Sequence, residues 1–260
     1  MRPPNSTQQT PAGHEVQFYA KVGVDGEKQT RRYMVSDPPG SKPQRLPSAT
    51  TVVGIFDKSR PFVRKALHLA SEGLDWYTHT DEAAARGTAA HGLIVRMMAD
   101  DQVGSLADLD VDHRPWGQQA AAWLLAREPE LIEAERFVVG PGYCGTFDLL
   151  CELDGIVNLI DFKTTKQEPV RWKNNQRVGL YPPYTEAAFQ LSAYALGCEY
   201  SGYPVPERLA IVRLWPGGYD EVEVPYQPDR FLSVLNAYRA KLDYDRELKA
   251  AMKAALEQAV

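Results

Sequence analysis

One apolar segment, residues 145–166, constrains the fold of this chain more than any other. Its sequence is GTFDLLCELDGIVNLIDFKTTK, in which β-branched and aromatic residues predict two strands. Asp154-Gly155 interrupts them with a dipeptide that suits the positive φ angles of a two-residue hairpin turn. Counting outward from that turn places Asp148 directly opposite Asp161. The segment therefore predicts the centre of a sheet in which two carboxylates lie side by side.

Charges at this place predict a cation site. Directly opposed strand residues have Cβ atoms about 4.5–5.5 Å apart, so two carboxylates there destabilise the pair unless a cation lies between them. Strand alternation puts Lys163 on the same face as Asp161. Carboxylates beside an ammonium group suit Mg²⁺ or Mn²⁺ holding a phosphate, as in phosphodiester hydrolysis. The alternative is a plain surface ion pair of Asp161 and Lys163, which strands this apolar on both faces disfavour.

Polar residues elsewhere in the chain could complete this site. His91 lies on a predicted helix, one turn after a glycine that would let a backbone or a phosphate approach. Glu135, on the strand predicted before the hairpin, could supply a further carboxylate, but Glu133 lies on the same strand face and the sequence leaves the choice open. Gln190 and Tyr194 are four residues apart and project from one side of a helix. Taken alone, such a histidine or Gln–Tyr pair more often packs in a core than contacts a ligand.

Five short segments carry these residues in order over residues 46–194. They are LPSATT (46–51), RGTAAH (86–91), GTFDLL (145–150), IDFKTTK (160–166) and QLSAY (190–194). Together they resemble the motifs of RecB-like nucleases of the PD-(D/E)xK superfamily. The resemblance implies an α/β fold whose central mixed sheet is flanked by helices, and a Mg²⁺- or Mn²⁺-dependent DNA nuclease, here expected to be an exonuclease. It also implies site roles: metal ligands His91, Asp148 and Asp161, the catalytic lysine Lys163, Gln190 and Tyr194 orienting the site and the DNA, and Glu135 as a further acid.

The resemblance also bears on cofactors and partners. Some relatives hold an iron–sulphur cluster with one cysteine before the histidine motif, whereas this chain has no cysteine before Cys144, so no cluster is expected. No GxxxxGK[ST] segment occurs, which predicts a stand-alone nuclease rather than a motor fusion. Small proteins of this kind resemble phage exonucleases of recombination, repair or replication, with DNA ends and phage or host recombination proteins as expected partners. The alternatives are an endonuclease of the same fold and a catalytically silent DNA- or protein-binding module.

The overall charge limits where nucleic acid could bind. The 260 residues include 29 Lys and Arg against 34 Asp and Glu, a net charge of −5, so a DNA site must be a local basic patch. The segment 160–180 is such a patch or, equally well, a solvated loop, and Trp172 within it could stack on a base. The residues expected to contact DNA are Arg86, Lys166, Arg171, Trp172 and Lys173.

The remaining pattern predicts how the chain is organised. Residues 1–13 are expected to form a flexible arm, and residues 14–260 one nuclease domain. Within that domain, residues 14–47 predict a peripheral hairpin, turning at Asp25-Gly26, and a proline-rich connector. Residues 48–200 form the motif-bearing core, and residues 201–260 the C-terminal strands and helix.

Periodicity and end signals place the individual elements. A helix should begin at Ser48, and further helices should cover 61–73, 81–99, 115–127, 185–196 and about 229–256. Strands are expected as a three-stranded meander over 131–165 and at 208–215 and 220–224. No signal peptide or membrane span is apparent, and the three cysteines form no CxxC pair, so a cytoplasmic protein is expected.

Overall fold

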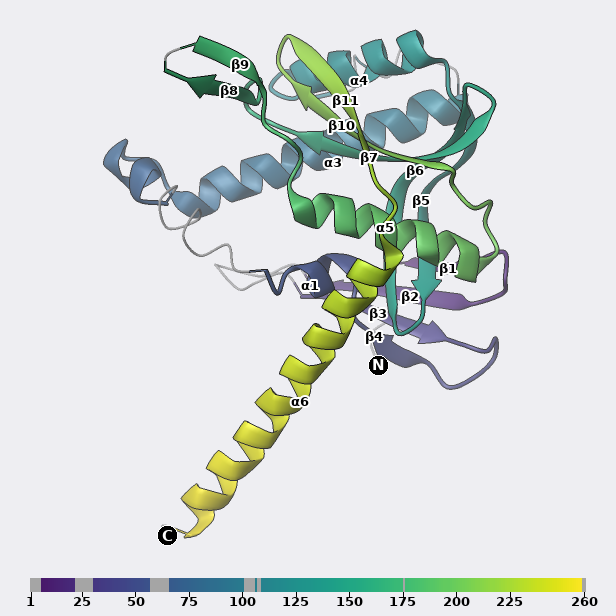
Figure 1. Cartoon of the computed structure of the whole chain (residues 1–260), viewed down its shortest axis with the longest axis vertical. Helices are drawn as coiled ribbons and strands as arrows, with labels where there is room; N and C mark the ends of the chain where they lie inside the picture. The colour runs from purple at the N-terminus through teal and green to yellow at the C-terminus, as the bar shows by residue number, and fades with distance from the viewer. Residues whose placement is uncertain are drawn as a thin grey trace.

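A five-stranded mixed sheet forms the centre of the molecule (Figure 1). The structure, a computed structural model, describes residues 6–21, 30–56, 66–100, 106, 109–174 and 176–258. The strand order is β11-β10-β7-β6-β5, in which β10 is parallel to β7 and the other neighbours are antiparallel. The strands are β5 (Glu130–Gly140), β6 (Tyr143–Leu153), β7 (Ile156–Thr164), β10 (Arg208–Trp215) and β11 (Gly218–Val224). The predicted meander and the two later strands are confirmed, and the fold is α/β with helices flanking the sheet.

Helices cover both faces of this sheet because both faces are apolar. On one face, α3 (Trp76–Asp100) and α4 (Arg114–Arg127) pack on a cluster that includes Leu149, Ile160 and Val212. On the other face, α1 (Ala49–Val53), α5 (Thr185–Ser201) and the first turns of α6 (Pro228–Gln258) pack on a cluster that includes Leu150 and Leu159. Consecutive strand residues thus alternate between the two layers. The rest of α6 extends away from the body (Figure 1).

The flexible arm predicted for residues 1–13 is wrong for the part that the structure describes. Ser6–Gln9 form strand β1, which pairs with β2 (Glu15–Lys21), and the Ala12 N–H donates to the Ser201 carbonyl at 2.8 Å. Residues 1–5 lie outside the described part. Backbone pairing rather than apolar burial orders this segment, so its polar composition gave no sign of a strand.

The predicted N-terminal hairpin is part of a second sheet of order β1-β2-β3-β4. Strand β2 pairs antiparallel with β3 (Thr30–Ser36), as expected, while the predicted turn at Asp25-Gly26 lies outside the described residues. The connector expected before residue 48 contains a short strand, β4 (Gln44–Leu46), which pairs with β3. The hairpin is therefore one half of a four-stranded sheet.

Helix ends follow their capping chemistry. Ser48 caps α1 as predicted, because its Oγ accepts a hydrogen bond from the Thr51 N–H at 3.0 Å. Helix α5 continues beyond the predicted residue 196 and ends at Gly202, whose φ of 77° suits a left-handed C-cap. Of the helix expected at 61–73, residues 66–71 are helical and 57–65 lie outside the described part.

The basic segment after β7 forms a two-stranded hairpin of its own. Its strands are β8 (Val170–Lys173) and β9 (Gln176–Leu180), and neither was predicted from the sequence. Figure 1 shows this hairpin projecting beside β10 and β11. Among the described residues, no helix is long and apolar enough to cross a membrane.

Candidate metal centre

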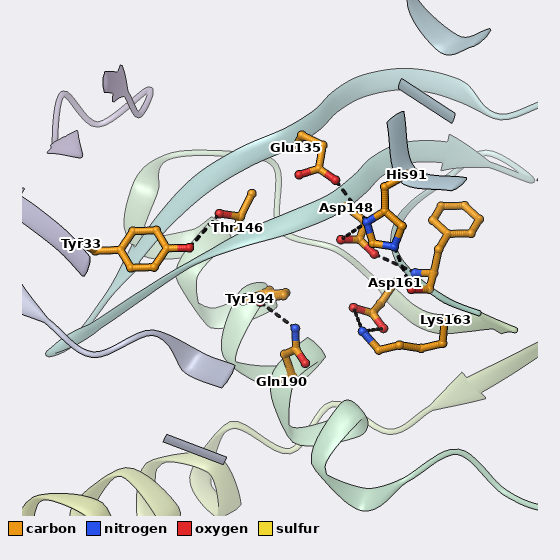
Figure 2. Close-up of polar contacts among 10 residues, drawn as sticks. Tyr33, His91, Glu135, Thr146, Asp148, Asp161, Lys163, Gln190 and Tyr194 are labelled. Carbon is orange, nitrogen blue, oxygen red and sulfur yellow. Dashed lines mark hydrogen bonds and ion pairs between the residues drawn. The ribbon is translucent and has the colours of Figure 1, made fainter. Parts of the chain in front are cut away.

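The candidate site lies where strands β6 and β7 part. Their backbone pairs run from Leu153 with Ile156 to Leu149 with Ile160, which is the register predicted from the Asp154-Gly155 turn. Beyond this pair, a side chain replaces the backbone acceptor: Asp148 Oδ2 accepts a hydrogen bond from the Phe162 N–H at 2.8 Å. Figure 2 shows the Asp148 and Asp161 carboxylates close to each other, on the same side of these strands, as predicted.

Three ligand atoms from three elements converge beside this opening. His91 Nδ1, from α3, lies 3.3 Å from Glu135 Oε1 and 3.4 Å from Asp148 Oδ1. Ligand atoms of His91, Glu135 and Asp148 all lie within 4.8 Å of one another. The side chains of His91 and Glu135 are 25% and 40% exposed, so a ligand can reach the cluster from solvent.

The histidine is oriented by a backbone carbonyl. His91 Nε2 donates a hydrogen bond to the Phe162 carbonyl oxygen at 3.0 Å, which leaves Nδ1 facing the two carboxylates. Burial lowers the pKa of His91, but Asp148, Glu135 and the Phe162 carbonyl outweigh it and raise that pKa to about 9. Nδ1 therefore binds a proton tightly, and a divalent cation would compete with that proton for the same nitrogen atom.

Of the two candidate acids on β5, the structure brings Glu135 into the site. Glu133 instead accepts a hydrogen bond from Arg136 Nε at 2.7 Å. A bulge between Leu131 and Glu133 shifts the strand register, and Glu135 has a left-handed φ of 50°. Such a backbone costs on the order of 1–3 kcal/mol in a residue other than glycine. With this backbone conformation, the Glu135 carboxylate lies 3.3 Å from His91 Nδ1.

Gln8 fixes this strained strand from the N-terminal segment. Its Oε1 accepts a hydrogen bond from the Phe137 N–H at 3.1 Å, and its Nε2 donates to the Glu135 carbonyl at 3.5 Å. Sequence reasoning missed Gln8, because it lies in the segment that was expected to be a flexible arm. The side chain replaces backbone partners that β5 lacks at its bend.

Asp161 and Lys163 form an ion pair next to the cluster, in which the Asp161 carboxylate is buried and the Lys163 side chain is 39% exposed. Lys163 Nζ lies 2.9 Å from Asp161 Oδ1 and 2.7 Å from Oδ2, and Asp161 is only 1% exposed. The alternative of a surface ion pair is therefore wrong. Among the described residues, the ligand atoms that lie within 4.8 Å of one another belong to His91, Glu135 and Asp148 and do not include Asp161. This predicted ligand therefore lies next to the cluster and is not part of it. The ammonium group holds its carboxylate.

Burial and neighbouring charges set the ionisation of this pair. Burial raises the pKa of Asp161 to about 6, with Lys163 opposing that rise and Asp148 adding to it. Burial alone would lower the pKa of Lys163, but the Asp161 and Asp148 carboxylates outweigh it, and the pKa is raised. Lys163 is consequently a cation at neutral pH.

Gln190 and Tyr194 lie on α5, next to this pair (Figure 2). Gln190 Nε2 donates a hydrogen bond to Tyr194 Oη at 2.7 Å. The Tyr194 ring is buried and packs over Gly145, where an added Cβ would lie 2.4 Å from Tyr194 Cε1. The glycine of the GTFDLL segment thus lets α5 approach the strand that carries Asp148.

We expect Gly145→Ala to lower stability by about 1–3 kcal/mol, because the new methyl group would overlap the buried Tyr194 ring. Thermal unfolding measures the effect. Gly92→Ala is the matched control: its Cβ would meet Arg96 Nη1 at an ordinary 3.4 Å, and alanine favours a helix interior over glycine by about 1 kcal/mol. Equal melting temperatures for Gly145→Ala and the wild type would contradict this packing role.

The predicted DNA-contacting residues fall into two places. Arg86 and Lys166 line one cavity beyond the end of β7. Arg171 and Lys173 lie instead on strand β8 and are exposed. The side chain of Trp172 lies outside the described part of the chain. The expected basic patch is thus divided between the cavity and the β8–β9 hairpin.

The residues present fit a divalent cation. Two carboxylates and an imidazole nitrogen converge, and the buried Asp161 carboxylate lies next to them. Carboxylate oxygens suit Mg²⁺ and Mn²⁺, and the imidazole is better suited to Mn²⁺. His91, Glu135 and Asp148 are the residues that would hold such an ion.

Metal affinity at this centre should rise with pH. The pKa of His91 is about 9, so at lower pH its Nδ1 carries a proton that the metal ion must displace. The Mn²⁺ affinity should therefore increase up to about tenfold for each pH unit between pH 6.5 and 8. Calorimetry in two buffers of different ionisation enthalpy measures the proton released. His91→Gln should lose the part of this dependence that comes from the imidazole and keep a part from Asp148, whose pKa burial raises, whereas the exposed His68→Gln should keep the whole dependence. An affinity independent of pH in the wild type would contradict proton competition at His91.

Comparisons with known proteins leave the family open. No protein-family model matches the chain, and no curated protein matches it. One solved structure, described as "Crystal structure of SSO0001", matches 58% of this chain and 72% of that chain, at 16% identity and a TM-score of 0.28. A likeness this low carries no argument, so function must be inferred from the site itself.

Proposed function

We propose that this protein is a metal-dependent DNA nuclease of the PD-(D/E)xK type, which hydrolyses phosphodiester bonds with Mg²⁺ or Mn²⁺ and acts as an exonuclease. One observation carries the proposal: a cluster of His91, Glu135 and Asp148 lies directly beside the buried Asp161 carboxylate and the partly exposed Lys163 ammonium group that pairs with it. A cation site next to a fixed ammonium group suits a phosphate whose charge increases during hydrolysis.

The protein's own residues have distinct roles in this proposal. A bound divalent ion would polarise the phosphate and lower the pKa of an attacking water. Asp148 and Glu135 hold the cation site, and the Phe162 carbonyl orients His91 toward it. The raised pKa of Lys163 keeps its proton in place, so the lysine supplies positive charge to the phosphate rather than removing a proton from water.

A catalytically silent binding module would not need this arrangement. Such a module could lose the carboxylates without loss of fold, and burial that raises the pKa of Asp161 makes its charged form costly to keep. A costly, nearly unexposed carboxylate is typical of a functional site. This observation favours an enzyme over a silent module.

Incubation with end-labelled linear DNA and with covalently closed circular DNA, each with and without Mg²⁺ or Mn²⁺, tests the proposal. An exonuclease should degrade only the linear DNA, and only with metal. Nicking of the circle would identify an endonuclease of the same fold, and binding without cleavage of either DNA would identify a silent module. Asp148→Asn, purified in parallel, controls for contaminating nucleases.

A further inference from the structure

A second polar site lies beyond the end of β7, between α3 and α4. It is a cavity of about 410 Å³ lined by Glu82, Arg86, Asp112, His113, Trp116 and Lys166. The Trp116 indole N–H donates to the Thr165 carbonyl at 2.7 Å, which fixes α4 against the chain that leaves β7. The cavity thus shares helix α3 with His91, and its Lys166 lies in the chain that follows the strand of Lys163.

Arg86 is the buried cation of this cavity. The residue is 6% exposed, its guanidinium carbon lies 4.9 Å from the centre of the Trp116 ring, and its Nε is buried with no hydrogen-bond partner among the described residues. Burial lowers the pKa of Arg86, with Glu82 opposing that shift, but an arginine remains charged at neutral pH. A buried guanidinium with an unused donor is costly unless a ligand satisfies it.

Lys166 adds a second cation at the rim. Its Nζ lies 3.6 Å from Glu82 Oε2, in a pair whose side chains are 49% and 57% exposed. Exposed pairs of this kind are weak, so an anion can displace the glutamate at little cost. Asp112 is also exposed, so solvent screens both acids, whereas Arg86 lies deeper.

The first turn of α4 favours the same ligand charge. His113 is its N-cap residue, whose side chain caps no N–H within the described residues, while the Arg114 and Gly117 N–H groups donate to the carbonyls of Asp110 and His113; the cavity lies against His113 and Trp116. The positive end of a helix dipole attracts anions. Together with the unsatisfied Arg86 donor, it makes the deep part of the cavity suited to a negative group.

We propose that this cavity binds a phosphate group of the substrate strand, on one side of the bond that is cut. Arg86 precedes His91 by five residues on α3, about 7.5 Å along the helix axis. Lys166 follows Lys163 by three residues, about 10 Å of extended chain. These separations are short enough for the bound phosphate to belong to the same strand as the phosphate at the metal centre. The inference rests on the proposed nuclease function and names a second contact of that site.

The first test uses inorganic phosphate and needs no catalysis. Phosphate should raise the melting temperature of the wild type above that in sodium chloride of equal ionic strength. Arg86→Met and Lys166→Gln should lose most of this shift, while Arg246→Gln, which removes an equal charge from the exposed part of α6, should keep it. Arg86→Met removes an unsatisfied buried charge, so its melting temperature without phosphate should not fall. Equal phosphate shifts in all four proteins would overturn the inference.

The second test uses DNA and distinguishes an internal phosphodiester from a terminal phosphate. For either source, Arg86→Met should raise KM about tenfold or more, the usual effect of losing a hydrogen bond to a charged group. An internal phosphodiester predicts the same increase for ends with and without a 5′-phosphate, whereas a terminal phosphate predicts an increase only for phosphorylated ends. Unchanged KM on both substrates would refute the cavity while leaving the nuclease proposal intact. Failure of the wild type to cleave would refute the nuclease proposal, and the phosphate melting test would still decide the cavity.

Discussion

Replacing Asp148 with asparagine should lower the cleavage rate on the order of 10³-fold, because the substitution removes one of the two carboxylates that hold the cation site. The asparagine oxygen can still accept the Phe162 N–H, so the strand register should persist. Burial raises the pKa of Asp148, which makes its charged form costly near neutral pH. The melting temperature without metal should therefore not fall.

Single-turnover cleavage, Mn²⁺ calorimetry and thermal unfolding on the same preparation measure these effects. Asp154→Asn is the matched control, since Asp154 lies exposed in the hairpin turn, where asparagine tolerates the left-handed φ of 56°. The control should cleave at close to the wild-type rate. Normal cleavage by Asp148→Asn, or an equal loss in both variants, would contradict the assignment.

Replacing Lys163 with methionine should lower the cleavage rate about 10²–10⁴-fold, because it removes the cation that faces the phosphate but keeps an alkyl chain of similar size. Metal affinity should hardly change, since the ammonium is not a ligand. Stability without metal should fall, because the buried Asp161 carboxylate loses its partner, but by less than the roughly 3–5 kcal/mol of a fully buried pair, since the Lys163 side chain is 39% exposed. Protonation of Asp161, with its pKa already near 6, should reduce that loss below pH 6.

Two further variants separate charge from position in this experiment. Lys163→Arg keeps the ion pair, so it should recover stability, while its longer and planar group should restore only part of the rate. Lys249→Met removes an equal charge from exposed α6 and should leave both rate and stability unchanged. A Lys163→Met protein that cleaves DNA at the wild-type rate would refute the role of Lys163.

Local chemistry made the centre of the fold predictable from sequence. The Asp154-Gly155 turn determines the pairing of β6 with β7, and alternation then places Lys163 beside Asp161. Ser48 indicated a helix start because its hydroxyl satisfies a free backbone N–H of the first turn. These features depend on residues close in sequence, where turn and capping preferences act directly.

Features that depend on distant partners could not be predicted in the same way. Glu135 reaches His91 through a left-handed backbone in mid-strand, which no residue type at that position indicates, and Gln8 supports it from a polar segment with no apolar pattern. Asp161 lies outside the close cluster because Lys163 holds its carboxylate, a competition between neighbours that strand alternation does not reveal. The positions of these three side chains depend on burial and on partners that are distant in the sequence.

The most direct test of the central claim is anomalous diffraction from crystals of this protein soaked in Mn²⁺. The account predicts a manganese peak bounded by His91 Nδ1 and the carboxylates of Glu135 and Asp148, and no such peak in Asp148→Asn crystals treated alike. A peak elsewhere on the molecule, or none between these three residues at saturating Mn²⁺, would contradict a metal centre at this site.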